Sequence, residues 1–118
     1  MFLQLFEDDE KPDVELEPGE TLFREGDEGD RAFVVRSGAV NLSMKGRPIS
    51  IIGESQIFGE MALLDDRTRS ATAIAGPDGA KLHSLDKALF IDMVKIDPEF
   101  AIELMKVMVE RLRSWTAK

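Results

Sequence analysis

The stretch from Phe58 to Ala73 contains residue types that together could hold a phosphate group attached to a sugar. Gly59 permits an unusual turn and close backbone approach, and the residues after it suit a short helix whose first amide groups have no partner within the helix. Those amides and the positive end of the helix dipole favour an anion. Arg69 and Ser70, expected on the following strand, would add a guanidinium fork and a hydroxyl. The pattern predicts that one phosphate is enclosed.

Glu60 is the member of this stretch that a phosphate does not explain, because its carboxylate would repel the anion. A carboxylate only accepts hydrogen bonds and so suits a ribose hydroxyl, whereas Arg69 only donates and suits phosphate oxygens. The same residues also fit a strand end followed by a helix with an acidic first turn, with Arg69 as a surface cation. Local chemistry alone leaves these two interpretations equal.

A longer pattern favours the first interpretation. Residues 58–64 are FGEMALL and, after a short loop, residues 69–72 are RSAT. This resembles the phosphate-binding cassette of the cyclic nucleotide-binding domain family, which includes the bacterial catabolite activator, regulatory subunits of the cyclic-AMP-dependent kinase and cyclic-nucleotide-gated channels. The segment from Leu16 to Val40, with PGE, EGD, GD and FVV in order, is similar to the family's first half. The motifs cover nearly the whole chain and are far more specific than a lone glycine motif.

The resemblance implies a role for each residue of the cassette. Glu60 matches the glutamate that binds the ribose 2′-hydroxyl, and Arg69 matches the arginine that binds the cyclic phosphate. Ser70 matches a residue that touches the phosphate. In several cyclic-GMP-selective members that residue is a threonine that also meets the guanine, so serine favours cyclic AMP without settling the choice. The other candidates in the cassette are Phe58 and four residues whose backbone groups would complete the cradle: Gly59, Met61, Ala62 and Ala71.

Length and composition indicate a single domain of 118 residues, 43% of them hydrophobic. We expect an N-terminal helix and connection at 1–12, the sheet at 13–85 and C-terminal helices at 86–118. The chain has no cysteine and one histidine, which argues against a disulfide, a thiolate or multi-histidine metal site and a catalytic triad. No apolar run is long enough to span a membrane. We therefore expect a non-catalytic cytoplasmic protein with no cofactor beyond its ligand.

The charge balance argues against nucleic acid as a partner. The chain has 15 basic and 23 acidic residues and a net charge of −8. An anionic ligand must therefore be held by short-range, partly buried groups rather than by long-range attraction. The acidic run from Glu7 to Glu10 is interpreted as a solvated connection rather than a calcium site, and the run from Glu25 to Asp30 as a tight turn between strands.

The fold class predicted for the chain is mainly β with flanking helices. Between residues 13 and 85, short runs rich in Val, Ile, Phe and Thr are separated by glycine- and proline-containing turns, which is typical of an antiparallel jelly roll. His83 lies in an alternating run, where an exposed strand position is expected. Met1 to Glu7 is predicted to be a short helix that packs on the domain.

Two helices should follow the sheet. Asp86 is a credible N-cap for a helix that ends near Ile96, and Asp97-Pro98 suits the start of a second helix that ends near Trp115. This helix carries two apolar stripes, which are Phe100, Leu104, Met108, Leu112 and Trp115 on one side, and Ile102, Met105 and Val109 on another. One stripe could pack on a second copy of the chain, as in family members that dimerise, or the helix could lie alone in a groove. The pattern does not separate these alternatives.

The end of this helix is a second candidate contact with the ligand. Aligned without a gap from Asp97 with the bacterial activator's long helix, Trp115 and Thr116 fall where that protein contacts the purine. Trp115 could act as a lid that stacks on the base, or it could only complete an apolar stripe. A lid would couple ligand binding to a change in the position of the helix.

Three classes of function follow. The leading one is a non-catalytic cyclic nucleotide receptor, with cyclic AMP ahead of cyclic GMP, that signals through its C-terminal helices to an unknown protein. The alternative is an interaction module that keeps the fold but no longer binds nucleotide. A jelly-roll enzyme ranks far behind. No helix-turn-helix, kinase-inhibiting sequence or channel is present in the chain, which is expected to be either a stand-alone sensor or a sensory piece of a larger regulator.

Overall fold

A computed structural model describes residues 2–7, 9–64 and 68–116. The chain divides into two compact units, Met1–Lys87 and Ala88–Lys118. The first unit contains a short 3₁₀ helix, the six strands of the sheet and a single turn of α-helix. Their bounds are η1 (Phe2–Leu5), β1 (Val14–Leu16), β2 (Thr21–Phe23), β3 (Arg31–Met44), β4 (Arg47–Ile52), β5 (Ile57–Phe58), α1 (Met61–Leu64) and β6 (Thr72–Asp86).

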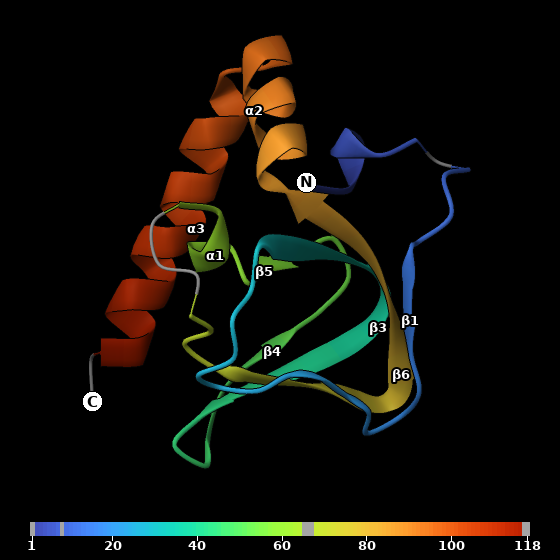
Figure 1. The fold of residues 1–118 in the computed structure, drawn as a ribbon, viewed down its shortest axis with the longest axis vertical. Coiled ribbons are helices and arrows are strands. Elements are labelled where there is room, and N and C mark those ends of the chain that lie inside the picture. The colour runs from blue at the N-terminus through green and yellow to red at the C-terminus, as the bar shows by residue number, and fades with distance from the viewer. Residues whose placement is uncertain (1, 8, 65–67, 117–118) are drawn as a thin grey trace. The chain divides into compact units, whose positions relative to one another are not determined.

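The two long strands β3 and β6 organise the sheet, and they run antiparallel side by side in Figure 1. The strand order is β1-β6-β3-β4, with β2 also paired to β6 and β5 to β3, and every pairing is antiparallel. Register shifts near Gly38 bend β3, and a Cβ at Gly38 would lie 2.2 Å from the carbonyl oxygen of Gly79. The predicted antiparallel fold is confirmed, although the six-stranded sheet does not close into a complete barrel.

Aromatic and branched side chains fill the interior of the first unit. Val34, Leu82 and Leu85 are fully buried on the two central strands. Rings from three different strands, Phe23, Phe33 and Phe58, cluster with centroids 5.5–6.2 Å apart. Such rings bury large apolar areas and prefer offset or tilted contacts. The cluster therefore ties β2, β3 and β5 together beneath the loops that carry the candidate site.

The N-terminal segment and His83 differ from their predictions. Instead of a helix over residues 1–7, the structure has only the 3₁₀ helix η1, although Phe2 and Phe6 are buried. His83 was expected to be exposed but is buried, with 1% of its surface accessible. The ring of Phe6 stacks on it, with the two ring centroids 4.2 Å apart. Arg36 donates a hydrogen bond from Nε to His83 Nε2 (2.9 Å) and another from Nη2 to the carbonyl of Glu7 (3.2 Å). The alternating pattern could not reveal that a distant segment covers this strand.

This arrangement predicts acid sensitivity. Burial, followed by the charge of Arg36, lowers the pKa of His83, while Glu10 and Asp13 oppose the shift. As the pH falls, His83 takes up a proton in the unfolded chain before it does so in the folded protein. The free energy of unfolding is therefore unaffected above the ordinary histidine pKa of about 6.5 and decreases as the pH falls below it. Urea unfolding between pH 7.5 and 5 should show wild type losing stability relative to His83→Gln, which keeps an acceptor but cannot titrate. A constant difference between the two proteins would contradict this.

The second unit consists of two helices, α2 (Lys87–Ile96), which begins at the last residue of the first unit, and α3 (Glu99–Thr116). Asp97 separates them, since its N–H bonds the Met93 carbonyl (2.9 Å) and its side chain accepts from the N–H of Glu99 (3.1 Å). These helix bounds confirm the prediction. Within the unit, Phe90 and Phe100 meet edge to face at 5.6 Å.

Candidate functional site

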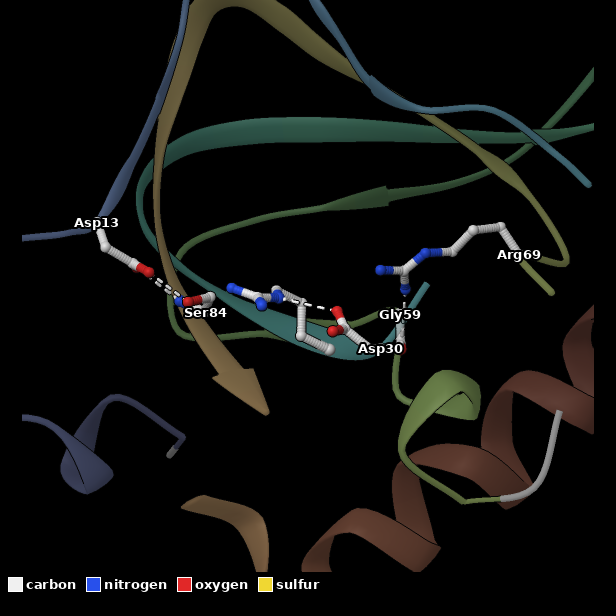
Figure 2. A network of polar contacts seen from close by, with 6 residues as sticks. Asp13, Asp30, Gly59, Arg69 and Ser84 are labelled. Carbon is white, nitrogen blue, oxygen red and sulfur yellow. Dashed lines mark hydrogen bonds and ion pairs between the residues drawn. The ribbon is translucent and has the colours of Figure 1, made fainter. Parts of the chain in front are cut away.

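The backbone of Arg69 is tied to the loop formed by residues 25–30. The Arg69 N–H bonds the carbonyl of Asp27 (2.7 Å), and the N–H of Gly26 bonds the carbonyl of Arg69 (2.8 Å). Arg69 and Ser70 were predicted on a strand, but they lie just before β6, which begins at Thr72. The side chain of Arg69 extends toward Gly59 (Figure 2), where its Nη1 donates to the carbonyl oxygen at 3.3 Å. The structure thus brings together two of the predicted site residues.

The guanidinium of Arg69 is buried and only partly satisfied. Arg69 is 7% exposed, which excludes its interpretation as a surface cation. Its Nε has no hydrogen-bond partner among the residues that the structure describes. Burial lowers the pKa of Arg69 and the charge of Asp30 opposes this, but an arginine stays protonated at physiological pH. Leaving a buried donor unsatisfied costs about 1–3 kcal/mol, so this nitrogen is poised for an acceptor.

Two glycines make room for this guanidinium. Gly59 has a φ of 75°, and a Cβ there would lie 2.9 Å from Arg69 Nη1. At Gly29, a Cβ would lie 2.1 Å from Arg69 Nε and 2.3 Å from its Cζ, far closer than van der Waals contact. Gly29 is a supporting residue of the candidate site that sequence reasoning missed, because its loop was interpreted only as a turn. The only feature of the sequence that could have indicated this role was the glycine itself, because a residue without a side chain allows another group to pack closely against it.

Glu60 follows Gly59 directly and is 4% exposed, so a carboxylate lies buried in the segment that contacts Arg69. The helix after it, α1, is a single turn of four residues. The N–H of Leu63 bonds the carbonyl of Glu60 (3.0 Å), and the N–H of Ala62 lies 3.4 Å from the carbonyl of Gly59. These amides already have acceptors, so α1 offers an anion fewer free donors than predicted.

The remaining candidates fall into two groups. Near Arg69, Met61 and Ser70 are exposed, Ala62 is partly exposed and Ala71 is 5% exposed. Phe58 as a whole is 0% exposed, and its ring lies in the aromatic cluster. Trp115 and Thr116 are the last two residues of α3, and their side chains lie outside the described residues.

A cavity of about 420 Å³ opens along β3 and β4. Ser43, on its wall, pairs with Thr72, which lies three positions after Arg69. The cavity is therefore lined in part by the strand that continues from the candidate site. Most of the lining is apolar, and the residues are Asn41, Leu42, Ser43, Pro48, Ile49, Ser50, Ile51 and Ile74.

Two further kinds of feature are absent from the described part of the chain. No group of three or more His, Asp or Glu side chains there could hold a metal ion. None of its helices is both long enough and apolar enough to cross a lipid bilayer.

Comparison with known proteins agrees with this geometry. The model of the cyclic nucleotide-binding domain matches residues 13–97. A CRP-like cAMP-activated global transcriptional regulator of Mycobacterium tuberculosis is 34% identical over 107 residues, covering 85% of this chain and 46% of that protein. A cGMP-dependent protein kinase of Toxoplasma gondii is 34% identical over 77 residues, covering 65% of this chain and 8% of that protein.

A solved structure is similar as well. The catabolite activator protein of Thermus thermophilus superposes with a TM-score of 0.73 at 34% identity, over 83% of this chain and 48% of that one. The chain thus spans less than half the length of each of these three proteins. Domains of this type are typically regulatory and non-catalytic, although some are parts of kinases. The matched family model, the antiparallel fold and the similar proteins lead to one conclusion: the chain belongs to the cyclic nucleotide-binding domain family.

Proposed function

We propose that this protein is a non-catalytic regulatory module that binds a cyclic nucleotide, with cyclic AMP as the preferred ligand. The observation that carries the proposal is the buried guanidinium of Arg69, whose Nε lacks a partner among the described residues and which two glycines accommodate. A buried donor of this kind fits a phosphodiester oxygen. The absence of cysteine is consistent with a cytoplasmic location, which we propose as well.

Each part of the ligand has a proposed partner. Arg69 would donate to the cyclic phosphate, with Ser70 and the backbone at Gly59, Ala62 and Ala71 around it. Glu60 would accept from the ribose 2′-hydroxyl, which is a reason for a buried carboxylate to sit beside an anion site. The exposed residue Met61 would line the same edge.

A thermal unfolding series tests the proposal. A ligand that binds only the folded form at 100 times its Kd adds about 2.7 kcal/mol to stability. For a chain of this length that corresponds to a rise of about 10 °C in Tm. We expect this rise with cyclic AMP, a smaller one with cyclic GMP and none with adenosine. Unchanged unfolding with both cyclic nucleotides, at concentrations up to 1 mM, would favour the alternative module that keeps the fold without binding.

Signalling through the C-terminal helices is the second part of the proposal. Trp115 is the only tryptophan of the chain and lies near the end of α3. Its fluorescence therefore reports on that helix alone. We expect cyclic AMP to change the emission and to slow amide exchange at the end of α3, which would support a lid. Saturating ligand that alters neither signal would place Trp115 outside the binding site.

The exposed side of α3 favours a second copy of the chain as a partner. Ile102, Met105, Val109 and Leu112 are 47–65% exposed, and their spacing of three, four and three residues places them on one helix face. Leu112 thus belongs with the exposed stripe, not with buried Phe100 and Leu104 as predicted. Burying four such side chains would offset the cost of ordering two helices against each other.

Sedimentation measures this association directly. We expect wild type to form a dimer at micromolar concentration and Met105→Glu to be monomeric, because a charge on the stripe would be buried without a partner. Ile51→Glu replaces an equally apolar residue, 72% exposed on β4, and should leave the dimer intact. A monomeric wild type at 100 µM would refute the proposal and favour a different downstream partner.

A further inference from the structure

The guanidinium of Arg69 lies against two rings of the aromatic cluster. Its Cζ is 4.2 Å from the ring centroid of Phe23 and 5.7 Å from that of Phe33. Both distances fall within the range in which a cation is attracted to the negative face of a ring. Sequence reasoning assigned neither phenylalanine a role toward Arg69, because both look like ordinary core residues.

Within the described residues, hydrogen bonds give this guanidinium little support. The bond from its Nη1 reaches the Gly59 carbonyl at 3.3 Å, which is long for N–H···O, and its Nε has no partner in the described chain. Asp30, whose charge acts on Arg69, is paired with the neighbouring cation Arg31 at 3.0 Å. The position of the guanidinium must therefore depend largely on the rings beneath it and on the space beside Gly29.

The rings are themselves well fixed. Phe23 ends β2 and pairs with Ala73 of β6, while Phe33 lies on β3 and pairs with Phe58 of β5. Phe23 is 9% and Phe33 is 4% exposed. Side chains in such a packed cluster keep one rotamer. A guanidinium that lies on these rings is therefore also held in one position. The strand pairings fix the two rings, and the rings in turn fix the end of the long Arg69 side chain.

We propose that Phe23 and Phe33 form an aromatic shelf that positions Arg69 for a phosphate before any ligand is present. They are positioning residues, since they act through Arg69 and need not touch the ligand. A guanidinium already held in its binding position loses less freedom when the phosphate arrives, which raises affinity. The inference rests on the proposed function for its effect on affinity, but the shelf itself is a property of the ligand-free protein.

The first arm of the test uses binding. Fluorination of Phe23, from 4-fluoro to 3,4,5-trifluoro, keeps the shape of the ring and progressively removes the negative face that attracts a cation. We expect the Kd for cyclic AMP to rise with each fluorine, to about tenfold in total. The same series at Phe100, which meets Phe90 in the second unit, should leave the Kd unchanged. If Phe23 acted only through packing, the Kd for cyclic AMP would not rise with the number of fluorines. That result would overturn the proposal.

The second arm needs no ligand. By NMR, the Nε proton of Arg69 in wild type should be shifted upfield by the ring currents and protected from exchange. Phe23→Leu should abolish both signatures and Phe23→Tyr should restore them, whereas Phe6→Leu, at another buried ring, should change neither. An unshifted proton in wild type would refute the shelf. If the signatures behave as expected but no cyclic nucleotide binds, the proposed function fails and the shelf stands.

Discussion

Replacing Arg69 by lysine should weaken binding of cyclic AMP by about a hundredfold, although the charge is retained. Lysine lacks the planar fork that gives two parallel bonds to phosphate oxygens, and its ammonium would not lie flat on Phe23. Loss of one charge-assisted hydrogen bond costs about 1.5–3 kcal/mol, and about 1.4 kcal/mol corresponds to tenfold in Kd. Isothermal titration calorimetry with cyclic AMP measures the change directly.

Arg31→Lys is the matched control for this substitution. Arg31 is the neighbouring arginine at the start of β3, with a side chain 44% exposed and paired to Asp30. A surface ion pair of this kind contributes about 0–1 kcal/mol, so its Kd should stay within a few-fold of wild type. Should Arg69→Lys bind as tightly as Arg31→Lys, Arg69 would not be the phosphate ligand.

Gly29→Ala should nearly abolish binding although Gly29 is not expected to contact the ligand. The new Cβ would fall 2.1 Å from Arg69 Nε and 2.6 Å from Nη2, so the guanidinium or the 25–30 loop must move. Either movement takes the fork away from the position fixed by Gly59 and the aromatic shelf. A displacement of about 1 Å in a positioned group is enough for a large functional loss. Calorimetry should detect no binding at concentrations that saturate wild type.

Two comparisons separate this effect from general damage to the fold. Gly53→Ala adds a methyl group whose nearest contact, Gln56 Oε1, is 3.8 Å away, and should leave both binding and Tm unchanged. In an Arg69→Ala background the atoms that clash are gone, so Gly29→Ala should then cost no stability. If Gly29→Ala destabilises both backgrounds equally, the loop rather than Arg69 is sensitive to the substitution.

Most of the fold, and the position of the cassette, could be predicted from local sequence patterns. Short β-rich runs between turns predicted the antiparallel sheet, and the Asp97-Pro98 pair predicted the break between α2 and α3. These features depend on residues close in sequence, such as capping side chains and turn glycines, which act in the same way in any tertiary context. The short helix predicted for residues 1–7 is present only as the 3₁₀ helix η1, because so short a segment takes its conformation from the surface on which it packs.

The sequence alone therefore determined which residue types are expected to meet a sugar phosphate and the order in which the chain presents them. The tertiary structure decided how Arg69 is held, because the residues that surround it come from distant segments: Phe23, Gly29, Phe33 and Gly59. It likewise decided the burial of His83 beneath Phe6. Contacts between residues far apart in the chain depend on the register of the sheet and on which segment covers which strand. The alternation of apolar and polar residues along one strand specifies neither of these.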